Sequence, residues 1–299
     1  MGLNSFEKSF FEDIHNDNKP NSISENDDNS LVRFALWNML TIGKMIRSAR
    51  ILPTNVNSKL KEESSPVTVL EFEIEEYVKK NIDLHLSGVS FVGEESGGEL
   101  PTDGLSLSLD PIDGTWSFLS HSESAAVSLT FFRGGIPFIG MVLNPATGEL
   151  AYVLNGNRTR LIQLPLFNEK INAVNLPTAE QDESIKNLVN LHPSKMAGTI
   201  SEKLYQSWKE GNLIHLKSLG GSPAWSLVEA AKGHYSYINL WQGAPAVSYD
   251  LACGILLVRG AGGDVVDMEG NSIKNIGHEG FFVAGVPKDK IYNILELVK

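Results

Sequence analysis

Residues 107–118 read LSLDPIDGTWSF, and they guide the interpretation of the whole chain. The apolar alternation over residues 107–109 predicts a buried strand that ends at Asp110, because Pro111 restricts its own φ and lacks a backbone N–H. The turn that follows is expected to bring Asp113 back toward Asp110. Two carboxylates that crowd one point repel each other unless a cation or a shared proton intervenes. The spacing therefore predicts a pair of acidic ligands at the end of a strand.

The type of ligand favours magnesium. Carboxylate oxygens are hard ligands that suit Mg²⁺, which prefers octahedral oxygen geometry and keeps part of its water. Gly114 and Thr115 are expected to open a helix over residues 115–119, whose free N–H groups would receive a phosphate. Taken alone, the DPID segment is equally consistent with aspartates that cap a loop turn.

Further acidic residues occur at two other places. Glu94 and Glu95, in FVGEESGG, directly follow an apolar strand, where an acid faces either a site or solvent. Asp250 lies in the first turn of the helical pattern SYDLACGILLVRG, where a capping acid needs no further function. Each of these positions has a structural alternative when it is considered by itself.

The chain is expected to have two halves after a flexible segment over residues 1–30. Apolar residues at three- and four-residue spacing predict helices over residues 31–49 and 68–82 in the first half, 31–183. Short apolar runs separated by turn signals predict an antiparallel meander with strands at residues 89–93, 105–110, 125–132, 137–144 and 150–154.

The second half, residues 184–299, follows a polar seam near residues 176–186. Helical and strand patterns alternate there, which predicts an α/β arrangement. RGAGGDVVD is not interpreted as a dinucleotide-binding loop, because its glycines follow a helical pattern and precede a strand, the reverse of the required order. The seven His residues are scattered and show no zinc spacing.

Composition limits the partners. With a net charge of −11 and no basic stripe, the chain of 299 residues is not expected to bind nucleic acid. The single Cys253 excludes an internal disulfide framework and is interpreted as a small buried residue in a protein of the reducing cytoplasm. No apolar run approaches the roughly 18 residues of a membrane span, so the chain is expected to be soluble.

The order of the motifs carries a resemblance. SPVT with Glu71 three residues after Thr68, GEES, LDPIDGTWSF, LGGSPAWSLVEAAKG and SYDLACGILLVRGAGG follow one another along the chain. Together they resemble the signature blocks of the inositol monophosphatase-like family of magnesium-dependent, lithium-sensitive phosphatases. The resemblance implies a layered αβαβα sandwich, the sugar-phosphatase fold of α+β type, with an antiparallel-sheet half and a mixed-sheet α/β half.

The resemblance also implies a metal centre of two or three Mg²⁺ ions. Glu94, Asp110 and the Ile112 carbonyl would hold the first ion, and Asp110, Asp113 and Asp250 would hold the second. A third, weaker ion would lie near Glu94 through waters. Two such ions can stabilise both the attacking and the leaving oxygen of an in-line displacement.

The resemblance also implies which residues act in catalysis and which contact the substrate. Thr115 and the acid at position 71 would orient the attacking water, with Asp110 completing the catalytic set. The partner is expected to be a small phosphorylated metabolite, and the protein a homodimer, since dimers are common in such families. The residues expected to contact phosphate or substrate are Asp113, Gly114, Thr115, Gly221, Ser222, Ala224, Trp241, Gln242 and Asp250.

Two positions depart from the family pattern. Glu71 stands where the family usually has Asp, and Ser117 where it usually has Asn, which leaves open a metal- and phosphate-binding homologue without turnover, or a purely structural one. INLWQGAPAVSYD lacks the acid that contacts the sugar hydroxyls in inositol-type members. We therefore expect that myo-inositol 1-phosphate is not the best substrate, while a sugar phosphate and 3'-phosphoadenosine 5'-phosphate stay open.

Overall fold

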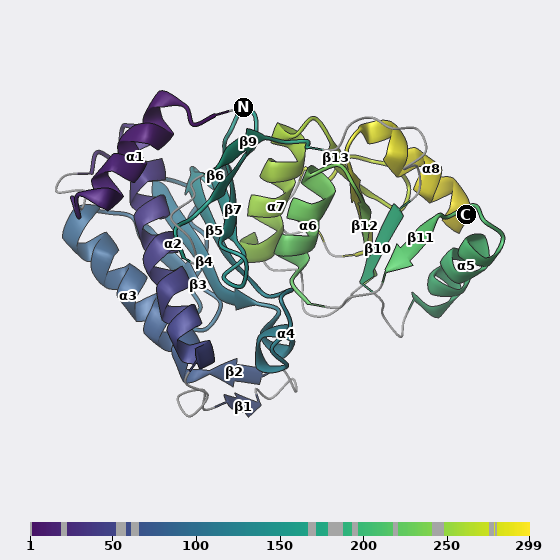
Figure 1. Cartoon of the computed structure of the whole chain (residues 1–299), viewed down its shortest axis with the longest axis horizontal. Helices are drawn as coiled ribbons and strands as arrows, with labels where there is room; N and C mark the ends of the chain where they lie inside the picture. Colours follow the sequence, from purple (N-terminus) through teal and green to yellow (C-terminus); the bar gives the residue numbers. More distant parts are fainter. Residues whose placement is uncertain are drawn as a thin grey trace.

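A computed structural model of the chain shows five layers, helix, sheet, helix, sheet, helix (Figure 1). This is the αβαβα sandwich expected from the motifs. The structure describes residues 2–18, 23–51, 58–60, 66–166, 172–178, 188–192, 197–217, 221–240, 248–274, 278 and 280–299. The predicted boundary between the halves, at residue 183, lies outside the described residues and stays a prediction.

The first half packs long helices on a seven-stranded sheet with strand order β3-β4-β5-β6-β7-β8-β9. Its helices are α1 Ser5–His15, α2 Asp28–Ile51, α3 Val69–His85 and the short α4 Thr115–Leu119. Its strands are β3 Ser90–Gly93, β4 Leu105–Asp113, β5 Ala126–Arg133, β6 Ile136–Leu143, β7 Glu149–Leu154, β8 Arg160–Gln163 and β9 Ala173–Asn175. The predicted meander is confirmed from β4 onward, whereas β3 pairs parallel to β4.

The second half contains a mixed five-stranded sheet of order β11-β10-β12-β14-β13. A small hairpin of β1 Ser58–Leu60 and β2 Pro66–Thr68 precedes α3 in the first half. The remaining helices are α5 Gly198–Lys209, α6 Pro223–Ala231, α7 Ser248–Gly260 and α8 Lys288–Val298. The strands of the mixed sheet are β10 Leu188–His192, β11 His215–Lys217, β12 Ser236–Asn239, β13 Asp264–Asp267 and β14 Phe282–Gly285.

The large sheet is buried on both faces, which explains its nearly continuous apolar strands. Val127, Leu129 and Phe131 of β5 join the core beneath α2 and α3, while the opposite face meets α7. Helix α7 lies close to β6, and a Cβ on Gly140 would stand 3.0 Å from the Cα atom of Cys253. Cys253 is fully buried, as expected for a small core residue.

Residues 1–30 are predicted to form a flexible segment, and this prediction is wrong for residues 5–15, which form α1. Phe10 and Phe11 are buried in the first core, so the helix is packed. Its start is a capping box in which Asn4 and Glu7 bond each other's backbone N–H groups. The many polar residues that follow α1 obscured this short amphipathic helix. Among the described residues, no helix has an apolar stretch long enough to cross a bilayer.

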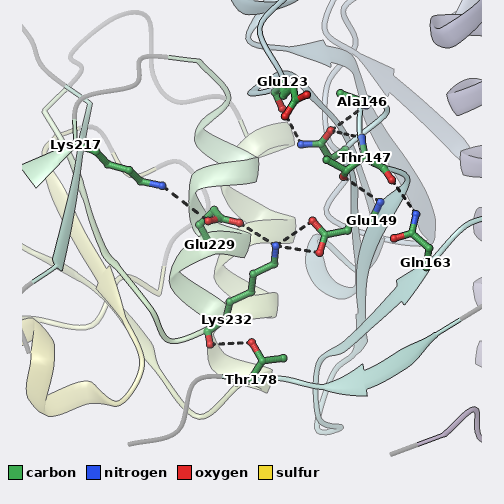
Figure 2. Close-up of polar contacts among 10 residues, drawn as sticks. Glu123, Ala146, Thr147, Glu149, Gln163, Thr178, Lys217, Glu229 and Lys232 are labelled. Carbon is green, nitrogen blue, oxygen red and sulfur yellow. Dashed lines mark hydrogen bonds and ion pairs between the residues drawn. The ribbon is translucent and has the colours of Figure 1, made fainter. Parts of the chain in front are cut away.

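One lysine connects the two halves (Figure 2). Lys232, just after α6, donates to both carboxylate oxygens of Glu149 on β7, at 3.1 and 3.2 Å, and to Glu229 on α6 at 2.9 Å. Glu229 also lies 3.9 Å from Lys217 at the end of β11. Charges from both sheets therefore meet at α6, which holds the central helical layer between them.

Glu7 anchors α1 to the sheet. Its carboxylate is fully buried and accepts hydrogen bonds from the Tyr152 hydroxyl at 2.8 Å and from Arg160 Nε at 2.7 Å. Burial alone would raise the pKa of Glu7, but the hydrogen bonds from Arg160, the Asn4 backbone and Tyr152 hold the pKa below its ordinary value. The carboxylate is therefore ionised near neutral pH and stabilises the fold.

We expect Glu7→Gln to lower the free energy of unfolding at pH 7 by about 3 kcal/mol, because Arg160 would keep a buried charge without its partner. A group with a lowered folded pKa stabilises above its unfolded pKa, and this contribution is lost as pH falls through the folded pKa. The difference from the parent should thus shrink below about pH 4.5. Urea unfolding at several pH values measures it.

The matched control is Glu12→Gln, on the exposed face of the same helix. This change should alter the unfolding free energy by no more than about 0.5 kcal/mol at any pH. Equal effects of the two substitutions would show that Glu7 does not anchor α1.

Candidate active site

The prediction that the strand ends at Asp110 is wrong. Strand β4 continues to Asp113, and its register with β5 shifts between Asp110 and Asp113. The irregularity follows from Pro111, which cannot donate to the ladder. The buried Asp110 carboxylate accepts the Ile112 N–H at 2.8 Å. The two aspartates thus flank a bulge formed by Pro111 and Ile112, with Asp110 opposite Ser128 and Asp113 opposite Ala126.

Asp113 faces the second half of the chain. Its carboxylate accepts hydrogen bonds from the Ser222 hydroxyl and, at 2.7 Å, from the Ala224 N–H. Ser222 is the N-cap of α6 and accepts the Trp225 N–H at 2.8 Å. A carboxylate at a helix N-terminus is stabilised by the helix dipole and the free N–H groups. Asp113 therefore joins the end of β4 to the start of α6.

Two glycines permit this close contact. Gly114 has φ +84°, and a Cβ on it would stand 2.8 Å from the Ser222 nitrogen. Gly221 has φ +131°, and a Cβ there would stand 2.8 Å from Ser124 Oγ and 2.9 Å from Ser117 Oγ. The predicted residues Gly114, Gly221 and Ser222 are thus brought together, with Ser117 beside them.

Glu71 comes to the site from the first turn of α3, as predicted. It is fully buried, so it is not an ordinary exposed helix residue. One carboxylate oxygen accepts the Thr68 N–H at 2.5 Å and completes the capping box. The other accepts the Thr115 hydroxyl at 3.1 Å, and the same hydroxyl lies 3.2 Å from the Ile112 carbonyl oxygen. A carboxylate and a hydroxyl from distant segments therefore share one site.

Three carboxylates converge here. Glu71, Glu94 and Glu95 each offer an oxygen within 4.8 Å of the others. Burial raises the pKa of Glu71 to about 7, with Glu95 and Glu94 adding to the rise and hydrogen bonds from Thr68 opposing it. Glu95 was noted in the sequence but not assigned as a ligand. Its only signal was its place next to Glu94 after an apolar strand.

Glu75 holds the backbone of the loop that carries Glu94 and Glu95. Its carboxylate is buried and accepts the N–H groups of Glu95 at 2.8 Å and Ser96 at 2.9 Å. It occupies the space beside Gly93, where a Cβ would stand 2.4 Å from Glu75 Oε1. A side chain at position 93 would displace the Glu75 carboxylate, so Gly93 allows Glu75 to set the direction of the loop.

For three predicted residues, the structure does not describe the side chain. Asp250 is the third residue of α7, in its first turn as predicted. Trp241 and Gln242 lie outside the described residues. The roles predicted for these residues, and the assignment of Asp110, Ile112 and Asp113 as ligands, stay predictions.

The donor set suits a divalent cation. Three carboxylates that crowd one point repel each other, and the pKa of Glu71 is raised mainly by its burial, with Glu95 and Glu94 adding to the rise. Carboxylate oxygens are the ligands that hard cations prefer. A bound cation would offset the charge, so the residues present fit a metal centre.

Comparisons with known proteins agree with this chemistry. The sequence profile of the inositol monophosphatase family matches residues 27–296. Inositol monophosphatase 2 of Saccharomyces cerevisiae is 26% identical over 210 residues, covering 67% of this chain and 68% of the relative. Inositol-1-monophosphatase of Bacillus subtilis is 27% identical over 215 residues, covering 68% and 73%.

A solved structure shows the same fold. The extragenic suppressor protein SuhB of Bartonella henselae superposes with a TM-score of 0.73 at 21% identity, covering 90% of this chain and 98% of that chain. The fold, the acidic site and the relatives define a phosphatase of small phosphorylated metabolites. The chain belongs to the inositol monophosphatase family, and it is therefore an enzyme, a phosphoric monoester hydrolase.

We expect Glu75→Gln to lower the free energy of unfolding by about 2 kcal/mol, because the amide nitrogen cannot accept the second of the two loop N–H groups. Glu76→Gln is the control, since Glu76 is exposed on the same helix and forms a surface ion pair with Lys80 at 3.3 Å. Its effect should stay within about 0.5 kcal/mol. Urea unfolding of both variants decides the point, and equal losses would remove Glu75 from its supporting role.

Proposed function

We propose that this enzyme is a Mg²⁺-dependent phosphatase that hydrolyses a phosphate monoester of a small metabolite with water. The observation that supports it best is the contact between the Thr115 hydroxyl and the buried Glu71 carboxylate, next to Glu94 and Glu95. Phosphate esters are hydrolysed very slowly in water, so charge stabilisation and positioning must supply most of the acceleration.

The metal side of the proposal uses the chain's acidic residues. Glu94, Asp110, the Ile112 carbonyl, Asp113 and Asp250 would hold two Mg²⁺ ions, with a third, weaker ion near Glu94. When bound, the ions supply positive charge that stabilises the phosphoryl group and activates the attacking water. Glu95 is added to the candidate ligands because it shares the cluster of Glu71 and Glu94.

The proton transfer is assigned to Glu71 and Thr115. The Thr115 hydroxyl donates to Glu71 Oε1, so its own oxygen is left as an acceptor that orients one hydrogen of a water. Glu71, as the general base, then accepts a proton from this water. A carboxylate whose pKa is raised to about 7 is suited to this role near neutral pH.

Substrate contacts are proposed on the opposite wall of the site. Gly114, Gly221 and Ser222 lie against one another at the N-terminus of α6, with Ala224 at its second residue. Trp241 or Gln242 would contact the leaving group. We also propose that the protein is a homodimer and that it acts in the reducing cytoplasm, the second point being in line with the single, buried Cys253.

A homologue that binds metal and phosphate without turnover is the alternative. Ser117 favours it, because a hydroxyl replaces the amide expected at this position. Its oxygen accepts a hydrogen bond from Ser124 Oγ at 3.2 Å, and Ser124 Oγ lies 2.8 Å from Ser122 Oγ. Ser117 therefore belongs to a cluster of serine hydroxyls, and an assay of phosphate release distinguishes the two functions.

We expect Glu71→Gln to lower kcat about 100-fold or more, because the amide keeps the shape but cannot accept a proton. Glu71→Asp should be milder, since it keeps the charge and shortens only the reach, although misplacement by about 1 Å can itself cost a hundredfold. Measuring kcat for both variants at saturating Mg²⁺ tests the assignment. A parent-like rate for Glu71→Gln would end it.

A substrate panel tests the function itself. Phosphate release from myo-inositol 1-phosphate, fructose 1,6-bisphosphate, adenosine 3',5'-bisphosphate and histidinol phosphate is measured with Mg²⁺ and with chelator. We expect Mg²⁺-dependent release and a best substrate other than myo-inositol 1-phosphate, because no acid precedes Asp250 in INLWQGAPAVSYD.

Two outcomes would contradict this. A rate at least about tenfold higher on inositol phosphate than on the other three would refute the substrate inference. Thermal stabilisation by Mg²⁺ with no release from any substrate would favour the binding homologue.

A further inference from the structure

A cavity lies at the end of α7 that is far from Asp250. It measures about 590 Å³ and is formed by the start of β6, the turn between β7 and β8, and the C-terminal turn of α7. Nine residues of helix separate Asp250 from Arg259 at this end, a rise of about 14 Å. The residues that line the cavity do not belong to the candidate active site.

The cavity is locally positive in an acidic protein. Arg158, Arg259 and Lys274 line it, and no Asp or Glu stands among its described lining residues. The whole chain carries a net charge of −11, so a concentration of three cations around one hollow is unusual for it. Such a surface attracts anions and raises their local concentration.

The C-terminus of α7 does not cancel this charge. The Gly262 and Gly263 N–H groups donate to the Arg259 and Val258 carbonyls, the Schellman arrangement, with Gly262 at φ +88°. Thr159 satisfies the two neighbouring carbonyls, because its hydroxyl donates to Leu257 at 2.7 Å and its N–H to Gly260 at 3.1 Å. The negative end of the helix is therefore occupied by protein donors.

The cations differ in how they are held. Arg259 is fixed by hydrogen bonds to Asp264 at 3.3 Å, to Ser272 Oγ and to a backbone carbonyl. Asp264 also accepts from Lys288 at 3.1 Å, so this group of two cations and one acid keeps a net positive charge. Within the described part of the chain, Arg158 and Lys274 are exposed and form no hydrogen bond or ion pair. Both can turn to an anion in the cavity.

Apolar residues also line the cavity. Ile136, Val153 and Leu256 line the cavity, and the Ile136 side chain is 67% exposed at its rim. The amides of Asn155 and Asn157 add hydrogen-bond donors beside Arg158. A volume of about 590 Å³ falls within the range of about 300–1,000 Å³ typical of small-molecule sites.

We propose that this cavity binds a small metabolite with a phosphate-like dianion at one end and an apolar or aromatic body. Arg158 and Lys274 hold the dianion through charge-assisted hydrogen bonds, and Arg259 adds fixed positive charge. The body packs on Ile136 and Leu256. The site needs no metal ion, so the inference is independent of the proposed function.

The test uses phenylphosphonate, a dianion with an aromatic body that a phosphatase cannot hydrolyse. Calorimetric titration of the full chain is done in the presence of chelator, which removes cations from the active site. We expect one binding site, weaker at high salt. Benzyl alcohol, which lacks the charge, should bind at least about tenfold more weakly, as should phenylphosphonate to the Arg158→Ala/Lys274→Ala double variant.

The control is Lys80→Ala/Lys209→Ala, which removes the same charge from exposed positions on α3 and α5. It should bind phenylphosphonate as the parent does. Parent-like binding by the Arg158→Ala/Lys274→Ala variant, or equal losses in both double variants, would overturn the proposal. All of the substituted side chains are exposed, and circular dichroism verifies that each variant is folded.

Discussion

The hydrogen bonds that Asp113 accepts at the N-terminus of α6 determine how the two halves of the molecule meet. They require the end of β4 to touch the start of a helix from the other half, and this is possible only because Gly114 and Gly221 have no side chains at the contact. The same contact places Thr115 one residue beyond the turn, where its hydroxyl reaches Glu71. The contact that joins the two halves therefore also assembles the site.

Charge gives the site its second constraint. The three glutamates are held in place by groups that do not take part in the chemistry, namely the Thr68 N–H for Glu71 and the Glu75 carboxylate for the loop of Glu94 and Glu95. This support keeps the acids together in spite of their repulsion. The layered fold supplies the rigidity, because both faces of the large sheet are covered by helices (Figure 1).

The sequence predicted those features that depend on local pattern. The periodicity of residues 31–49 and 68–82 identified α2 and α3, and the family resemblance of the ordered motifs implied the layered fold. Features that depend on contacts between distant residues were not visible in it. The partnership of Glu7 with Arg160 spans 153 positions, and the support of Glu95 by Glu75 joins a helix to a loop. The parallel pairing of β3 likewise has no signature in a short apolar run.

The anchoring of α1 has a consequence for synthesis on the ribosome. The residue that holds the helix in place, Arg160, is translated 153 residues after Glu7. At about 5–20 residues per second, the delay is roughly 8–30 s. During that time the Glu7 carboxylate lacks its cationic partner. The buried ion pair that fixes α1 to the sheet is therefore completed only after β8 has been translated.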